Sequence, residues 1–155
     1  MRSHLWLVAA LAGCQGSASA PPEPPGPRKL ELIEAPATTD IAAYLAPLIA
    51  RANGDHRTLV VYVGASWCEP CRHFHDAAAA HQLDDQFGQL RLIAFDADRD
   101  LDALDAAGYR SPMIPLFALP NADGRASGKQ FAGSIKGDDA VAQIAPNLHA
   151  LVDRH

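Results

Sequence analysis

A pair of cysteines three positions apart constrains this chain more than any other feature of its sequence. Cys68 and Cys71 come shortly after a continuous apolar, largely β-branched run at residues 58–63, and an amphipathic segment begins beside them. Such a run is typical of a strand buried on both faces, and the segment that follows is typical of a helix. The two cysteines are therefore expected where a buried central strand gives way to a helix.

The spacing of the cysteines indicates chemistry more than covalent stabilisation. A disulfide between Cys68 and Cys71 closes a very short loop, and such loops restrict the unfolded chain only slightly. At a helix start, free backbone N–H groups and the helix dipole favour the thiolate of Cys68, which is the nucleophile in disulfide exchange. Cys71 follows on the same face of the helix, where it can attack a mixed disulfide formed at Cys68.

The remaining segments predict a mixed α/β sheet with helices on both faces. The early alternation of strands and helices is typical of parallel strands with crossover helices, and a later tight turn favours an antiparallel hairpin. Prolines at 47 and 146 predict a kink and an interruption in the first and last helices. The expected helices cover residues 41–52, 70–83, 101–107 and 138–152, and the expected strands cover 58–63, 90–95, 116–119 and 128–132.

The first residues have the pattern of a targeting segment. Arg2 precedes a short apolar run that is too short to span a bilayer, and the segment ends in Leu11-Ala12-Gly13-Cys14. This ending resembles the bacterial lipobox, in which the peptide is cut before the cysteine and the cysteine is lipidated. Residues 1–13 are therefore expected to be a lipoprotein signal peptide, with Cys14 anchoring the protein on the periplasmic side of a bacterial membrane. An ordinary cleaved signal peptide with an incidental cysteine is the alternative.

A Pro-rich segment and a globular domain are expected to follow the leader. Residues 14–38 are rich in Pro, Ser, Ala and Gly, which favours an extended spacer with no core of its own, and residues 39–155 are expected to form one domain. The net charge is −5, and the basic residues do not cluster. This charge distribution argues against a nucleic-acid partner.

Two motifs resemble those of the thioredoxin superfamily. The sequence from Trp67 to Arg72 is similar to that superfamily's WCxPC motif with a following basic residue, and Ile114-Pro115-Leu116 is similar to its cis-proline segment. The resemblance implies a thioredoxin fold and a thiol–disulfide oxidoreductase, and the predicted leader implies that it acts outside the cytoplasm. The resemblance also implies a monomer that needs no cofactor and acts on protein thiols or disulfides. A reductase in an oxidising periplasm would in addition need an upstream redox partner. The catalytic residues would be Cys68 and Cys71, and the substrate groove would comprise Trp67, Glu69, Pro70, Ile114 and a cis Pro115.

The chain departs from the superfamily pattern behind the second cysteine. Tyr62 occupies the position of a buried Asp that serves as proton acceptor for the second thiol, and a phenol with a pKa of about 10 is a poor base near neutrality. Water, or Glu69 with its side chain folded back, are the substitutes considered. Glu69 also opposes the negative charge of a thiolate at Cys68, which favours a reducing potential over a strongly oxidising one.

A metal site is the alternative function. His75 follows Cys71 by four positions and shares its helix face, so Cys68, Cys71 and His75 are candidate ligands of a copper- or zinc-binding chaperone. A module that binds partners without redox chemistry is a third possibility. The acidic residues at 96, 98, 100 and 102 resemble a calcium loop but lack its central Gly and distal Glu, so a solvated turn is expected there.

Overall fold

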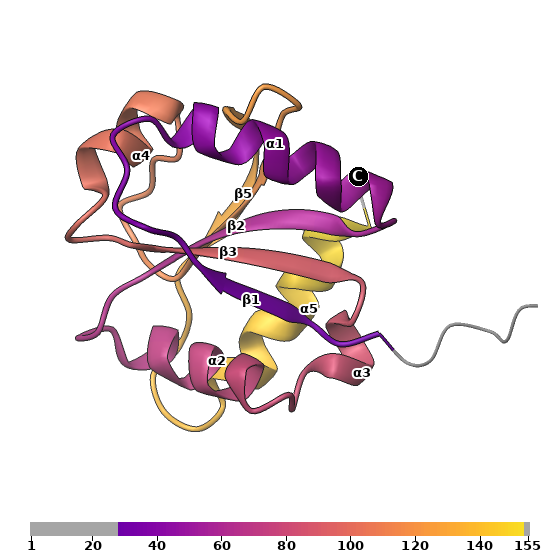
Figure 1. The fold of residues 1–155 in the computed structure, drawn as a ribbon. Helices are drawn as coiled ribbons and strands as arrows, with labels where there is room; N and C mark the ends of the chain where they lie inside the picture. Colours follow the sequence, from indigo (N-terminus) through magenta and orange to yellow (C-terminus); the bar gives the residue numbers. More distant parts are fainter. Residues whose placement is uncertain (1–27, 154–155) are drawn as a thin grey trace, which may run out of the picture.

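A computed structural model describes residues 28–153 and shows a central sheet with helices on both faces (Figure 1). This confirms the predicted fold class. The predicted signal peptide and Cys14 lie outside the described residues. The elements in chain order are β1 (Glu31–Glu34), α1 (Ile41–Gly54), β2 (Thr58–Gly64), α2 (Glu69–Ala79), α3 (Asp84–Phe87), β3 (Leu90–Asp96), α4 (Leu101–Ala107), β4 (Leu116–Pro120), β5 (Ala126–Ala132) and α5 (Ala140–Val152).

The sheet has the strand order β1-β3-β2-β4-β5. Strands β1 and β2 both run parallel to β3, while β4 pairs antiparallel with β2 and β5 pairs antiparallel with β4. The parallel part therefore comes from the alternating first half of the chain, and the hairpin comes from the second half, as predicted. Within residues 28–153, no helix is both long and apolar enough to cross a membrane.

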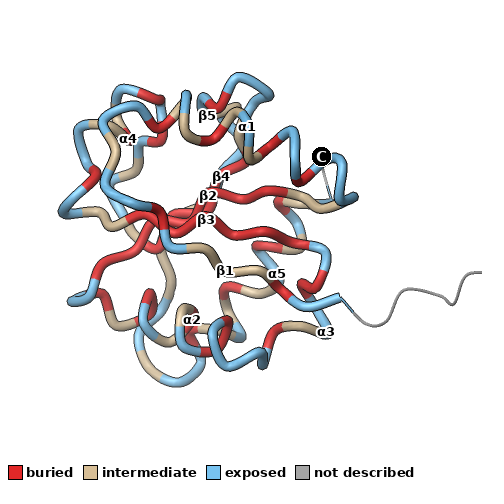
Figure 2. The backbone as a smooth tube through the Cα atoms, in the orientation of Figure 1, coloured by how far each residue is buried: buried red, intermediate tan, exposed pale blue. Residues whose placement is uncertain are grey.

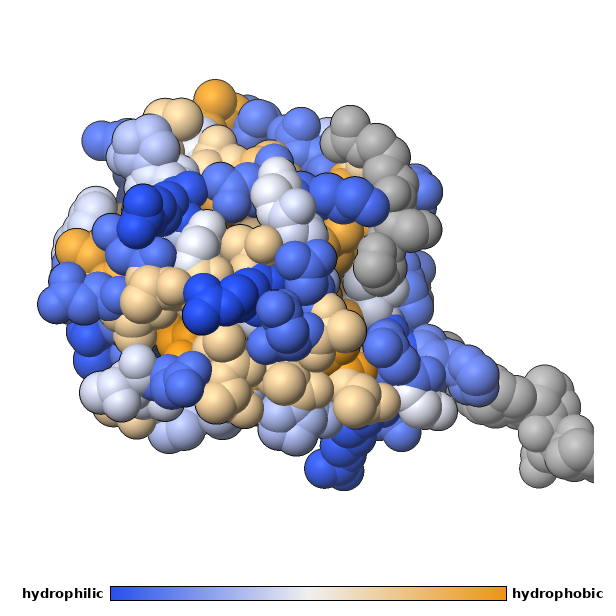
Figure 3. Space-filling model, turned by 90° about the horizontal axis from the view of Figure 1, so that it is seen from above, coloured by the Kyte–Doolittle hydropathy of each residue, from blue (hydrophilic) through white to orange (hydrophobic). Residues whose placement is uncertain are grey.

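Strand β2 runs through the centre of the molecule, and every residue of it after Thr58 is buried (Figure 2). Val60 and Tyr62 belong to the core beneath α2, α3 and α5, whereas Val61 and Val63 belong to the core beneath α1 and α4. Successive side chains of a strand point to opposite faces, so a strand between two cores needs apolar residues at every position. This explains the uninterrupted apolar run before the cysteines. On the face seen from above, hydrophilic side chains are interspersed with apolar ones (Figure 3).

The domain includes a strand within the segment that was predicted to be a linker. Residues 31–34, which we assigned to the Pro-rich linker, form β1 and pair in register with Arg91 to Ala94 of β3. Leu30 and Ala35 on either side of the strand are buried. The linker prediction was wrong here because the segment after the prolines carries its own apolar residues, and these complete both cores at the edge of the sheet.

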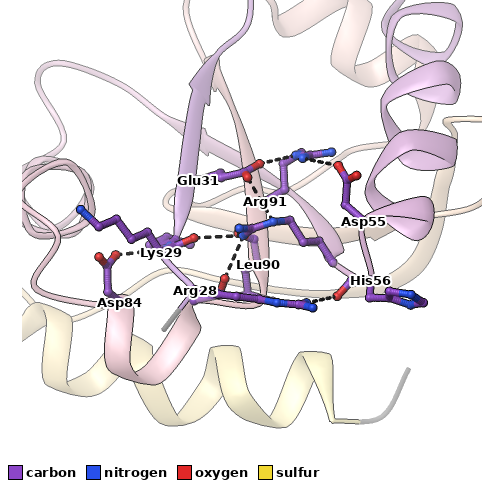
Figure 4. Close-up of polar contacts among 11 residues, drawn as sticks. Arg28, Lys29, Glu31, Asp55, His56, Asp84, Leu90 and Arg91 are labelled. Atoms are coloured by element: carbon purple, nitrogen blue, oxygen red, sulfur yellow. Dashed lines mark hydrogen bonds and ion pairs between the residues drawn. The ribbon is translucent and has the colours of Figure 1, made fainter. Parts of the chain in front are cut away.

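An ion-pair cluster holds β1 at this edge (Figure 4). The carboxylate of Glu31 accepts a hydrogen bond from the buried guanidinium of Arg91 and pairs with Arg57 at 3.1 Å. Arg91 also donates to Asp55, just after α1, at 2.8 Å. Hydrogen bonds between charged groups are stronger than neutral ones, so this cluster joins β1, β3 and the end of α1.

Two helix predictions needed correction. The predicted helix at 70–83 ends at Ala79, and His81 has a positive φ of 60° before the separate short helix α3. The predicted interruption at Pro146 does not occur, because α5 continues through it from Ala140 to Val152. Ile144, Leu148 and Leu151 on one face of α5 are buried in the core, and this packing outweighs the hydrogen bond that proline removes.

Candidate active site

Cys68 occupies the N-cap position of α2, as the sequence predicted. Its side chain accepts a hydrogen bond from the backbone N–H of Cys71 at 3.3 Å, and the two cysteines form a disulfide. Only 5% of Cys68 and 2% of Cys71 is exposed. The backbone donor aimed at the Cys68 sulfur is the interaction that stabilises a thiolate there.

Helix α2 is fixed in place by its first turn and its buried face. Pro70 lies in the first turn, where a missing N–H leaves no intrahelical hydrogen bond unmade. Phe74 and Ala78 are buried in the core under the sheet. The position of both sulfurs therefore depends on a helix whose start and inner face are determined locally.

A groove opens beside the disulfide. The peptide bond between Ile114 and Pro115 is cis, as expected, and Ile114 packs against the two cysteines. Of the five predicted groove residues, four line a cavity of about 400 Å³ and Pro115 is buried next to it. Sequence reasoning missed Met113, whose side chain is 57% exposed on this cavity. The groove is lined by Trp67, Cys68, Glu69, Pro70, Met113 and Ile114, among others.

The exposed indole of Trp67 is held in one orientation by an acidic side chain. Its Nε1–H donates to Asp98 at 2.8 Å, although 67% of Trp67 is exposed. Asp98 lies in the acidic turn after β3, where Asp96 accepts hydrogen bonds from the backbone N–H groups of Asp98 and Arg99. These acidic residues therefore build a turn that positions Trp67.

Glu69 is directed across the groove. Its carboxylate accepts a hydrogen bond from the Gly137 N–H at 3.2 Å and lies 3.8 Å from His73 Nε2. The hypothesis that Glu69 folds back to serve Cys71 is therefore wrong in this structure. The carboxylate remains near the start of α2, where it opposes negative charge at Cys68.

Tyr62 is buried directly behind Cys71. Its hydroxyl donates to the backbone carbonyl of Cys71 at 2.9 Å, and its ring packs against Phe74 and Phe117. Burial, reinforced by the negative charges of Glu34 and Asp76, raises the pKa of Tyr62 far above its ordinary value. Tyr62 is thus a structural hydrogen-bond donor and no base for Cys71 near neutrality.

His75 makes a contact that the sequence did not predict. Its Nε2 lies 2.7 Å from a carboxylate oxygen of Glu34 on β1. Within residues 28–153, no three His, Cys, Asp or Glu side chains are grouped so that they could hold a metal ion. The structure therefore adds no support for the chaperone hypothesis based on Cys68, Cys71 and His75.

Two curated proteins and a solved structure resemble this chain. Thioredoxin H-type from Chlamydomonas reinhardtii is 26% identical over 108 residues, which is 69% of this chain and 82% of that protein. Probable nucleoredoxin 1 from Arabidopsis thaliana is 30% identical over 92 residues, 58% of this chain, but the chain spans only 15% of that protein's length. The X-ray structure of Fasciola hepatica thioredoxin is 25% identical with a TM-score of 0.51, covering 81% of this chain and 98% of the other. No protein-family model matches the sequence.

The fold and the cysteine pair together define a class of protein. A five-stranded mixed sheet flanked by helices, with a CxxC disulfide capping a helix after the central strand, is the arrangement of a thioredoxin-like thiol–disulfide oxidoreductase. The chain has the thioredoxin fold, and its sequence is similar to those of thioredoxins.

Proposed function

We propose that this protein exchanges its Cys68–Cys71 pair with protein substrates outside the cytoplasm, acting mainly as a reductase and anchored to a membrane through Cys14. The observation that carries the proposal is the position of Cys68, which caps α2 and borders the groove. The backbone donor at its sulfur stabilises the attacking thiolate, and the groove gives a substrate access to it.

The exchange proceeds in two displacements. In the reduced protein, the Cys68 thiolate attacks a substrate disulfide, which forms a mixed disulfide and releases one substrate sulfur as a thiolate. The Cys71 thiol then loses its proton and attacks Cys68, which restores the Cys68–Cys71 disulfide and releases the second substrate thiolate. Two electrons pass from the protein to the substrate.

The surface beside the disulfide supports a protein as the substrate. Trp67 and Met113 are large apolar side chains that are mostly exposed, and both line the groove next to Cys68. Exposed apolar groups of this size are typical of surfaces that contact other proteins. By the superfamily resemblance, the backbone at Ile114 would pair with an extended substrate segment.

The direction of electron flow can be tested through the reduction potential of the Cys68–Cys71 couple. Strongly oxidising members of this class owe their potential to a stabilised thiolate, and Glu69 at the start of α2 works against that stabilisation. We expect a potential near the thioredoxin value of about −270 mV, measured by equilibration with glutathione or dithiothreitol. A potential near about −120 mV would instead indicate an oxidase. A reductase in an oxidising compartment requires an upstream electron donor, which the proposal includes.

The proposed membrane anchor at Cys14 can be tested separately. Several acyl chains on one residue hold a protein stably at a bilayer, whereas a single chain binds only marginally. We expect Cys14→Ser to move the protein from the membrane fraction to the soluble fraction and to abolish incorporation of labelled fatty acid. Ser17→Ala, three residues away, is the matched control and should stay with the membrane. If Cys14→Ser fractionates like the wild-type protein, the anchor is not at this cysteine.

A further inference from the structure

A second cavity lies behind the disulfide. It has a volume of about 320 Å³, and its walls come from the ends of β1, β2 and β3 and from one side of α2. Cys71 and Tyr62 form part of its lining, and His75 lies one helical turn beyond Cys71 on the same helix face. A water molecule occupies about 30 Å³ in the liquid, so this cavity, which both Cys71 and His75 line, has room for water.

The chemistry of Cys71 requires a proton acceptor, and neither Tyr62 nor Glu69 supplies one. The resolving attack needs the Cys71 thiolate, yet Cys71 is buried with only 2% exposed. The Tyr62 hydroxyl donates a hydrogen bond to a backbone carbonyl, and the Glu69 carboxylate accepts a hydrogen bond from Gly137. An imidazole is the side chain that exchanges protons most readily near neutral pH, and His75 lines the same cavity as Cys71.

The ring of His75 is arranged to receive a proton. When Nε2–H donates to Glu34 at 2.7 Å, the other nitrogen, Nδ1, carries the lone pair. Nδ1 lies 3.7 Å from a carboxylate oxygen of Asp76, so an imidazolium would have a carboxylate near each of its two N–H groups. A carboxylate that holds one nitrogen of an imidazole fixes its tautomer and its orientation.

The charges that face the cavity are mixed in sign. Arg99 is hydrogen-bonded to Asp100 and to the backbone of Ala35, so its charge is largely committed to that turn. Glu34 and Asp76, whose carboxylates lie beside the His75 ring, are mostly exposed to solvent. The charged and titratable groups facing the cavity beside His75 are Glu34, Tyr62, Arg72, Asp76, Asp96 and Arg99.

We propose that His75, held by Glu34, accepts the proton of the Cys71 thiol through water in this cavity; this inference rests on the proposed exchange function. When a mixed disulfide has formed at Cys68, the Cys71 proton passes to water and a proton passes from that water to His75 Nδ1. The Cys71 thiolate forms a bond to the Cys68 sulfur, and the bond between Cys68 and the substrate sulfur breaks. The substrate leaves as a thiolate, and the imidazolium returns its proton to solvent.

The two displacements can be timed separately with a symmetrical aromatic disulfide. Attack by Cys68 releases one coloured thiolate, and resolution by Cys71 releases a second. In stopped-flow mixing with the reduced protein at pH 5.5–8.5, we expect His75→Gln to leave the first phase within about twofold and to slow the second phase about tenfold or more near neutrality. The second phase of this variant should then rise steadily with pH, without the inflection that a titrating imidazole gives.

Further variants separate a role in proton transfer from a role in folding. Glu34→Gln retains His75 and is expected to slow the second phase by a smaller factor. Free imidazole added to His75→Ala should restore part of the lost rate, which a structural role would not permit. His81→Asn is the control, because His81 is exposed and pairs with Asp84 instead of lining the cavity.

The outcomes distinguish this inference from the function on which it rests. If the wild-type protein shows both phases and His75→Gln shows the same second phase and pH profile, His75 is not the proton acceptor. An equal slowing in His75→Ala with no response to imidazole overturns the inference as well. If the wild-type protein releases no thiolate at all, the exchange function itself is wrong.

Discussion

Replacing Cys68 by serine is expected to abolish disulfide exchange, with a loss in rate of at least about a thousandfold. The sulfur of Cys68 caps α2 and receives the Cys71 N–H, so the attacking charge is stabilised at this atom. A serine hydroxyl in the same position stays protonated near neutral pH and does not attack a disulfide at a useful rate. The measurement is the appearance of thiols in a disulfide-bonded protein mixed with an excess of the reduced variant.

Cys71→Ser is the matched variant on the other sulfur. It retains the attacking thiolate but has no second thiol, so the reaction should stop at a covalent complex between Cys68 and the substrate. Mass spectrometry under non-reducing conditions would show this complex, and a reductant would release it. Exchange that survives in Cys68→Ser, or a complex that forms through a different cysteine, would contradict the assigned order of attack.

The second large effect concerns the core beneath the site. Phe117→Ala is expected to lower the free energy of unfolding by about 3–5 kcal/mol. Phe117 is fully buried, and its ring centroid lies 4.8–5.1 Å from those of Tyr62, Phe74 and Phe131. Truncation removes a central ring from this cluster and leaves a cavity between β2, β4 and α2. For a domain of this size, we expect the midpoint of thermal unfolding to fall by roughly 10–20 °C.

Leu101→Ala provides the control for this stability measurement. Leu101 opens α4 and is 57% exposed, so removing its side chain should change the free energy of unfolding by about 0.5 kcal/mol or less. Both variants should be measured in the oxidised state by denaturant titration. Similar losses in the two variants would show that the cluster around Phe117 is not the centre of the core.

Much of the fold was predictable because its signals are local. Apolar residues at every position of 59–63 identify a strand between two cores, and α4 has the predicted bounds of 101–107. The position of the cysteine pair was also predictable, because both cysteines lie at the junction of that strand and the next helix. Short-range patterns of this kind determine an element without reference to the rest of the chain.

The missed features depend on contacts between distant parts of the chain. Strand β1 has four residues and is stabilised by pairing with β3, about sixty positions away, and by the ion pair between Glu31 and Arg91. The contact of Glu69 with Gly137 likewise joins residues that no local pattern connects. The pairing of His75 with Glu34 becomes visible only when β1 is placed in the sheet, because Glu34 lies on this strand and lines the cavity behind Cys71.

Thiol counting by mass spectrometry after a single turnover measures the exchange most directly. Reduced wild-type protein is mixed with a protein that contains one disulfide, and the reaction is stopped with an alkylating agent. The molecular masses of both proteins are then measured. We expect one Cys68–Cys71 disulfide to form for each substrate disulfide that opens into two alkylated thiols. If Cys68 and Cys71 are recovered as alkylated thiols while the substrate disulfide stays intact, the protein does not exchange disulfides with protein substrates.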